Sequence, residues 1–246
     1  LEKLIEFHIE NKTDVIISVG TTGESATLDF DEHSKVIKAT LEIVNKRIPV
    51  IAGSGANSTS EALHLTQRSK DLGADACLLV TPYYNIPTQK GLYAHYKKIA
   101  DEVSIPQILY NVPGRTSVDM LPETVESLST HPNIVGIKEA SGNLDRSREI
   151  LDRCSENISI FTGDDKTSAR DILMGFKGNI SVTANIAPKL CSDMQKFSKS
   201  NSDNELKEAE RIDQILQPVH KSLFAESNPA PVKYAAKLLG LSLIHI

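Results

Sequence analysis

The segment IVGIKEASG (residues 134–142) begins with an apolar, β-branched run and then carries a lysine. Such a run, without polar alternation, is typical of a strand in a parallel sheet that is covered on both faces. Because side chains alternate along a strand, we expect Lys138 to share a face with Ile134 and Gly136, and the glycine to leave room for the amine. Apolar surroundings favour the neutral amine, which can attack a carbonyl and form a Schiff base. On this segment alone, a lysine that extends from the strand end into solvent is the alternative.

Six further strand-like runs occur along the chain, and helical patterns separate them. The predicted strands cover residues 15–19, 49–52, 77–80, 107–110, 134–138, 158–161 and 179–182. Tandem strand-helix repeats at fairly even spacing, with no break in composition, predict an α/β fold in which a parallel sheet closes into a (β/α)8 TIM barrel. A doubly wound open sheet is the alternative, which the even spacing disfavours.

The two ends of the chain suggest that the barrel is incomplete. The sequence opens at Leu1 in an amphipathic helix, so we expect the first barrel strand to be missing from this chain. Residues 1–200 are expected to form the TIM barrel, and residues 201–246 the end of the barrel and a truncated helical appendage. Helices are predicted at 190–216 and 231–239. A sheet closed over such a gap would leave two unpaired edges, from which we expect poor solubility and activity.

The composition is that of an ordinary globular protein. The 246 residues are 40% hydrophobic and 24% charged, with a net charge of −5 that offers no basic surface for nucleic acid. No apolar run is long enough to span a membrane. Three scattered cysteines fit buried thiols in a reducing compartment. We therefore predict a cytoplasmic location and neither nucleic acid nor membrane as a partner.

Polar and glycine-rich loops follow the predicted strands, whereas the opposite loops look like ordinary connections. Examples are residues 20–25, 81–85, 111–116 and 162–165. TIM-barrel enzymes build their active sites from the loops at the carboxyl ends of the strands. Lys138 lies at the same end, which favours the Schiff-base interpretation over the solvent-exposed one.

The other candidate chemistries fit this end of the barrel less well. The histidines fall in predicted helices or helix-to-strand loops, so we expect no metal site and no cofactor. Asp164 and Asp165 would repel a phosphate where barrels usually bind one. An amine nucleophile with hydroxyl helpers remains. Tyr110, Thr21 and Tyr84 lie near strand ends and are candidates for the proton transfers, although each alone is more often a packing or capping residue.

Three segments of this sequence resemble one enzyme family. They are residues 20–25, 110–116 and 136–142, with the sequences GTTGES, YNVPGRT and GIKEASG. They are similar to the dihydrodipicolinate synthase (4-hydroxy-tetrahydrodipicolinate synthase) family of pyruvate-dependent class I aldolases, which also include N-acetylneuraminate lyases. The resemblance extends from Leu1 to about Leu241, whereas residues 242–246 depart from it. It implies condensation of pyruvate with L-aspartate 4-semialdehyde on the route to diaminopimelate and lysine.

The resemblance also implies roles for individual residues. Lys138 would carry pyruvate as the imine, and Tyr110, Thr21 and Tyr84 would form the catalytic proton relay. Tyr84 would come from a second subunit across a dimer interface, within a homotetramer built as a dimer of dimers. The implied substrate-binding residues are Thr22 for the pyruvate carboxylate, Arg115 for the semialdehyde carboxylate, and Gly163 and Ile180 around Lys138.

Arg115 separates the alternatives within this superfamily. A guanidinium fork suits the carboxylate of the semialdehyde, and lyases that act on sialic acid lack this arginine. An aldolase of the N-acetylneuraminate lyase type therefore remains the alternative enzyme. A catalytically silent barrel that binds a keto acid is the alternative from another class, and a turnover assay distinguishes it.

The resemblance further implies L-lysine as an inhibitor that binds at a dimer interface. The corresponding allosteric positions are Ser25, Ala26, His33, Asn57, Glu61 and Tyr83. Phe30 stands where some lysine-sensitive relatives have a histidine. A polar surface that only packs between subunits is the alternative.

Overall fold

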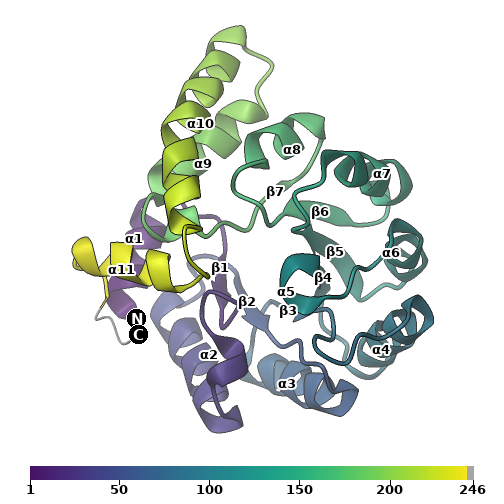
Figure 1. Ribbon diagram of the computed structural model, residues 1–246. Helices are drawn as coiled ribbons and strands as arrows, with labels where there is room; N and C mark the ends of the chain where they lie inside the picture. The colour runs from purple at the N-terminus through teal and green to yellow at the C-terminus, as the bar shows by residue number, and fades with distance from the viewer. Residues whose placement is uncertain (243–246) are drawn as a thin grey trace.

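Seven parallel strands curl about a central axis, and helices surround them on the outer side (Figure 1). This computed structural model describes residues 1–242. Neighbouring strands pair in chain order, which confirms the predicted α/β fold of the TIM-barrel type. The strands are β1 (Ile16–Ser18), β2 (Val50–Gly53), β3 (Ala76–Val80), β4 (Gln107–Asn111), β5 (Ile134–Glu139), β6 (Ser159–Thr162) and β7 (Gly178–Asn179).

The helices between the strands begin and end where short-range chemistry predicts. Asp29 and Thr88 cap the first turns of α2 and α4 through their side chains, and Gly73 ends α3 with a φ of +94°. None of the described helices is long and apolar enough to cross a membrane. The helices are α1 (Glu2–Glu10), α2 (Phe30–Val44), α3 (Thr59–Leu72), α4 (Gln89–Glu102), α5 (Pro113–Thr116), α6 (Pro122–Ser129), α7 (Leu144–Cys154), α8 (Ser168–Met174), α9 (Pro188–Ser198), α10 (Asp203–Leu223) and α11 (Ala230–Leu238), with 3-10 turns η1 (Ser25–Thr27) and η2 (Thr183–Asn185).

Two apolar layers hold the barrel together. The outer layer lies between strands and helices and includes Leu109 and Ile137. The inner layer fills the barrel and includes Leu78, Ile108 and Tyr110. Successive residues of one strand belong to different layers, as the alternation of side chains requires.

The expected alternation along β5 is wrong at one position. Gln107 of β4 pairs with Ile134, but the next residue, Ile108, pairs with Gly136, so β5 contains one extra residue at Val135. This β-bulge turns Ile134 into the outer layer, on the opposite face from Gly136 and Lys138. The sequence pattern alone does not show where a bulge interrupts the period of two.

Strand β7 is shorter than predicted and begins one residue earlier. It covers Gly178–Asn179 rather than 179–182. The amides of Val182 and Thr183 instead donate to the Asp165 carboxylate, both at 2.9 Å. A buried carboxylate therefore binds the backbone where the strand was expected to end, and the chain turns into η2.

The single helix predicted over residues 190–216 is two helices. The chain leaves α9 after Ser198, and Ser202 is the N-cap residue of α10, without a side-chain capping hydrogen bond. Serine and asparagine favour caps and turns over helix interiors, which accounts for the break.

The last described helix, α11, lies beside the first helix, α1 (Figure 1). Lys3 Nζ of α1 donates to the Gly240 carbonyl, just after α11, at 2.7 Å. Residues 242–246 are expected to depart from the resemblance, and of these, residues 243–246 lie outside the described residues.

Candidate active site

Lys138 and Tyr110 lie side by side at the carboxyl ends of β5 and β4. The two residues are opposite each other in the register of the strands. The Lys138 Nζ atom is 4.1 Å from the centroid of the Tyr110 ring. Tyr110 is buried in the inner apolar layer. The face of an aromatic ring attracts an ammonium group and also shields an amine from water, so this contact fixes where the amine lies.

The room for the lysine comes from Gly163 and not from Gly136. A Cβ atom built on Gly163 would lie 2.6 Å from Lys138 Cε and 2.7 Å from Ala140 Cβ. A Cβ built on Gly136 would instead meet the Ser159 carbonyl oxygen at 2.9 Å. The expected role of Gly136 is therefore wrong, because strand β6 and not the lysine occupies the space beside it. Gly163 follows β6 directly and lets the lysine stem pass.

Thr22, Arg115 and the turn after α10 come together at the same end of the barrel. Asn228 donates from Nδ2 to Thr22 Oγ1 at 3.0 Å, and its backbone carbonyl accepts from Arg115 Nη2 at 2.8 Å. The side chain of Asn228 is buried, and its Oδ1 has no hydrogen-bond partner among the described residues. Two residues predicted to bind carboxylates are thus linked by one asparagine that the sequence did not single out.

Thr21 and Ile180 lie in the turns that follow β1 and β7. The Thr21 carbonyl accepts from the Glu24 amide at 3.0 Å. The amide of Ile180 donates to the Thr162 carbonyl at 2.9 Å, which continues the pairing between β6 and β7 by one residue. Both backbones are fixed, and their side chains are partly buried.

Tyr84 differs from the other predicted catalytic residues. Its side chain is 90% exposed, and its φ of +73° is a conformation that residues other than glycine seldom adopt. The neighbouring Ile86 is 60% exposed, with φ +46°. The fold does not bury Tyr84 at its own barrel mouth; it presents the ring on an outer loop.

The residues predicted to bind lysine divide into buried and accessible members. His33 is buried in α2, and this burial lowers the pKa of its imidazole. Burial, together with the nearby Glu61 carboxylate, raises the pKa of Tyr83. The Asn57 carbonyl accepts a hydrogen bond from the loop that carries Tyr83, and Phe30 packs edge-to-face on His64 at 5.5 Å. Ser25 and Ala26 form η1, directly after the loop that follows β1.

Buried thiols and imidazoles at other positions are poor candidates for the chemistry. Burial raises the pKa of Cys77 to about 11 and that of Cys191 to about 12, so both thiols are protonated and inert at neutral pH. Burial lowers the pKa of His95 to about 4. Within residues 1–242 no group of three or more His, Cys, Asp or Glu side chains could hold a metal ion.

Sequence reasoning missed a buried charged group directly behind the lysine. Glu139 follows Lys138 and forms an ion pair with Arg146 of α7, with 3.1 Å between Oε2 and Nε. Asn111, which follows Tyr110, donates to the same Oε2 atom. The one available signal was a polar residue at the end of each apolar strand, which resembles an ordinary loop residue until its partners are known.

Comparison with known proteins agrees with the fold and the site geometry. The chain matches the sequence model of the Dihydrodipicolinate synthetase family over residues 1–245. It is 58% identical, over 241 residues, to the 4-hydroxy-tetrahydrodipicolinate synthase of Pseudomonas putida, and the match covers 98% of this chain and 82% of that protein.

Two solved structures show the same likeness. The chloride-inhibited dihydrodipicolinate synthase of Acinetobacter baumannii, complexed with pyruvate, has a TM-score of 0.94 and 52% identity, covering 98% of this chain and 81% of that one. The enzyme of Cyanidioschyzon merolae with lysine bound has a TM-score of 0.93 and 38% identity, with the same coverage of 98% and 81%. A family match over nearly the whole chain and close relatives of the same name lead to one conclusion: the chain belongs to the dihydrodipicolinate synthetase family.

Proposed function

We propose that this protein catalyses the reaction of the 4-hydroxy-tetrahydrodipicolinate synthases, in which pyruvate condenses with L-aspartate 4-semialdehyde through a Schiff base. The observation that carries the proposal is the Lys138 amine, held against the Tyr110 ring at 4.1 Å with Gly163 leaving room for its stem. The names of the close relatives and the pyruvate complex of one of them support the same reaction.

The proposed chemistry starts at Lys138. Its neutral amine attacks the keto carbon of pyruvate, a C–N bond forms, and a proton passes from the nitrogen to the former carbonyl oxygen. A second proton lets that oxygen leave as water, and the protonated imine remains. Loss of a methyl proton then gives the enamine, whose carbon forms a C–C bond to the aldehyde carbon of the second substrate, while the aldehyde oxygen takes up a proton and the protonated imine forms again. Tyr110, Thr21 and the Tyr84 ring of a second subunit are the proposed proton carriers, because hydroxyl groups at the barrel mouth can pass protons in both directions.

Thr22 and Arg115 are proposed to bind the two substrate carboxylates. A guanidinium holds a carboxylate through charge-assisted hydrogen bonds, which are stronger than neutral ones. Arg115 is exposed, and among the described residues its side chain donates only from Nη2, to the Asn228 carbonyl, so its other donors are available to a substrate. Gly163 and Ile180 complete the proposed pocket around the lysine.

Borohydride trapping tests the proposal. Reduction in the presence of pyruvate should add a stable mass to the peptide that contains Lys138, and Lys138→Ala should abolish it. Arg115→Ala should still trap pyruvate. Its turnover with the semialdehyde should fall, because about 2–5 kcal/mol of transition-state stabilisation is lost. A label on any other lysine contradicts the assignment of Lys138, and equal loss of both steps in Arg115→Ala contradicts the role of Arg115.

Inhibition by L-lysine is proposed for the surface formed by Ser25, Ala26, His33, Asn57, Glu61 and Tyr83. The proximity of the Glu61 carboxylate to Tyr83 supports it, since a carboxylate and a phenol can both bind the ammonium groups of lysine. The lysine-bound relative supports it as well. Partial inhibition by lysine should disappear in Glu61→Ala and persist in Glu42→Ala, a change to an exposed carboxylate of α2. A wild-type protein that lysine does not inhibit contradicts the proposal.

A homotetramer, arranged as a dimer of dimers, is proposed as the working assembly, and the cytoplasm as its location. Tyr84 and Ile86 expose apolar surface on a strained loop, which suits contact with a second subunit. Three free, buried thiols, Cys77, Cys154 and Cys191, suit a reducing compartment. Light scattering at several concentrations measures the assembly. Mixed assemblies of Tyr84→Phe and Lys138→Ala subunits should regain activity if the ring serves the neighbouring site.

A further inference from the structure

A charged network, buried except at Asp119, joins the ends of β4 and β5 on the outer side of the sheet. Asn111 follows Tyr110, Glu139 follows Lys138, and Asn111 and Glu139 are opposite each other in the strand register. Because side chains alternate along a strand, these two residues face away from the barrel interior that holds the amine. We call the network the β4–β5 clamp, and its side chains are those of Asn111, Asp119, Glu139 and Arg146.

The Glu139 carboxylate is the centre of the clamp. Its Oε2 accepts from Asn111 Nδ2 and from Arg146 Nε, each at 3.1 Å, and its Oε1 accepts from the Ser141 amide at 2.8 Å. Glu139 is 3% exposed, so the carboxylate is held by protein donors and not by bulk water. Both oxygens are therefore fixed in direction, and β5 is fixed with them at the residue after the lysine.

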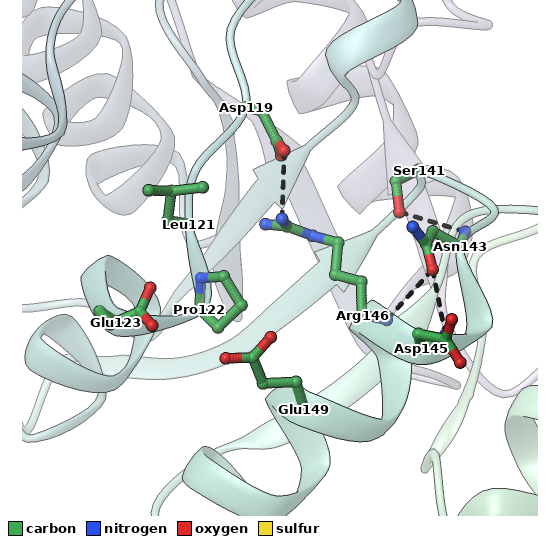
Figure 2. Close-up of a pocket in the computed structure, with 9 residues that line it drawn as sticks. All are labelled: Asp119, Leu121, Pro122, Glu123, Ser141, Asn143, Asp145, Arg146 and Glu149. Carbon is green, nitrogen blue, oxygen red and sulfur yellow. Dashed lines mark hydrogen bonds and ion pairs between the residues drawn. The ribbon is translucent and has the colours of Figure 1, made fainter.

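The clamp also fixes the segment that carries Arg115. Arg146 donates from Nη1 to Asp119 at 3.1 Å (Figure 2). It also donates from Nη2 to the Met120 carbonyl. Asn111 donates to Asp119 at 2.9 Å and accepts from the Met120 amide at 3.0 Å. Figure 2 shows the Arg146 side chain extending from its helix towards Asp119, at a surface pocket of about 460 Å³. The loop between β4 and α6 is thereby tied at both ends to one buried ion pair.

Stability alone does not account for this arrangement. Taking a carboxylate and a guanidinium out of water costs several kcal/mol per ion, and apolar replacements of such pairs are often neutral or stabilising. What a fully bonded charged pair provides is one defined geometry. Catalysis by a positioned amine needs such geometry, because a displacement of about 1 Å can cost about a hundredfold in rate.

We propose that Glu139 is a positioning residue, which rests on the function proposed above. Asn111 and Arg146 hold Glu139, and Glu139 in turn keeps the Lys138 amine against the Tyr110 ring. It does not touch the substrates, since it lies on the outer face of the sheet. It acts through the two strand ends, which carry the nucleophile and the proposed proton carrier in the positions directly before the clamp residues.

A double-mutant cycle tests the proposal. The rate of imine formation is measured by mixing the protein with pyruvate, quenching with borohydride at set times and determining the labelled fraction of the Lys138 peptide by mass spectrometry. Four proteins are compared: wild type, Glu139→Gln, Tyr110→Phe and the double variant. Glu139→Gln should slow the step by about tenfold or more, with pyruvate affinity changed by less than about threefold. In the Tyr110→Phe background the same substitution should cost less than about threefold, because the hydroxyl towards which the amine is positioned is already gone.

Matched variants separate positioning from general damage. Arg146→Lys keeps the positive charge but loses the forked guanidinium group, and it should also slow imine formation. Arg153→Lys lies on the same helix and also changes an ion-paired arginine, but its partners Glu123, Glu126 and Glu149 are helix residues, so it should behave as wild type. If Glu139→Gln does not fold, Arg146→Lys takes its place in the cycle.

The outcomes distinguish this inference from the proposed function. A wild-type protein that traps no pyruvate refutes the proposed function and the positioning role with it. A wild type that traps pyruvate normally, together with equal losses from Glu139→Gln in both backgrounds or no loss in either, overturns the positioning role alone.

Discussion

Two buried carboxylates lie near the ends of the neighbouring strands β5 and β6 at the barrel mouth, and they are bound in different ways. Glu139, 3% exposed, faces the guanidinium of Arg146 in the β4–β5 clamp. Asp165, 2% exposed, accepts from the Asn179 amide side chain and from the backbone amides of Val182 and Thr183, all at 2.9 Å. One side uses a paired charge between separate elements, and the other uses neutral donors within one local turn.

The difference shows what each carboxylate can control. The clamp connects β4, β5 and α7, so its loss should change the positions of residues on several elements. The turn around Asp165 sets only the end of β7 and the start of η2, and it borders the buried contact between Thr183 Oγ1 and His220 Nδ1 at 2.7 Å. Several buried polar atoms on this second side have no partner among the described residues, including Asn179 Oδ1 and His220 Nε2. We therefore expect the clamp side to be the more rigid.

The largest expected effect is on the clamp. Arg146→Met removes the cation and leaves the buried Glu139 carboxylate without its charged partner, which should destabilise the protein by about 3–5 kcal/mol. Arg153→Met breaks exposed ion pairs on the same helix and should cost about 1 kcal/mol or less. Urea unfolding of both variants measures the difference. Equal losses would mean that the clamp is no stronger than a surface network.

Asp165→Asn should have a smaller effect on stability. The amide keeps one acceptor oxygen but places an NH2 group against either the Asn179 donor or the Val182 and Thr183 donors, which should cost about 1–3 kcal/mol. Asp164→Asn is the control, because its Oδ1 accepts from the Lys166 amide at 2.8 Å and asparagine makes the same turn. If Asp165→Asn lowers the free energy of unfolding by more than Arg146→Met does, the comparison is reversed.

Gly163 connects the two sides, since its amide donates to the Glu139 carbonyl at 2.7 Å and its chain continues to Asp165. Gly163→Ala should slow imine formation by about tenfold, about 1.4 kcal/mol, because the new methyl group would displace the stem of Lys138. Gly114→Ala, where a Cβ meets nothing within 4 Å, should leave the rate unchanged. Unchanged trapping in Gly163→Ala would show that the lysine can move aside freely.

The smallest expected effect depends on pH. Burial lowers the pKa of His220 from 6.5, against the raising effect of Asp165 and Asp213. The neutral ring therefore stabilises the fold above about pH 6.5, and this contribution is lost as the pH falls through the lowered pKa. Hydrogen exchange at the Val182 and Thr183 amides should speed up on acidification relative to the Ser141 amide. His220→Gln should remove that difference, and an unchanged difference would exclude His220 as its source.

Much of the fold follows from local patterns in the sequence. Apolar runs locate every strand to within a residue or two, apart from β7, because a strand buried on both faces needs a continuous apolar segment. Gly73 ends α3, since the left-handed cap conformation favours glycine. The gathering of polar loops at one end of the sheet follows in turn from the parallel strand order.

The misses around the candidate site depend on contacts that no short segment contains. Gly136 and Gly163 look alike in the sequence, and only the neighbouring strand shows which of them borders Lys138. Glu139 looks like a solvated loop residue until Arg146 of α7 is placed against it. The roles of Lys138 and Tyr110 stay predictions until the trapping experiments are done.

The extra residue at Val135 has a consequence for changes in chain length. It lets two strands that start level at Gln107 and Ile134 finish with Tyr110 level with Lys138, although β5 contains one residue more between these points. Deleting Val135 would give a more regular ladder and a shorter gene. The pairs from Ile108 with Gly136 to Asn111 with Glu139 would remain, so Lys138 would stay on the inner face and Glu139 on the outer one. Val135 is also 38% exposed, so its loss removes little buried apolar surface, and this irregularity is a place where the protein should tolerate a deletion.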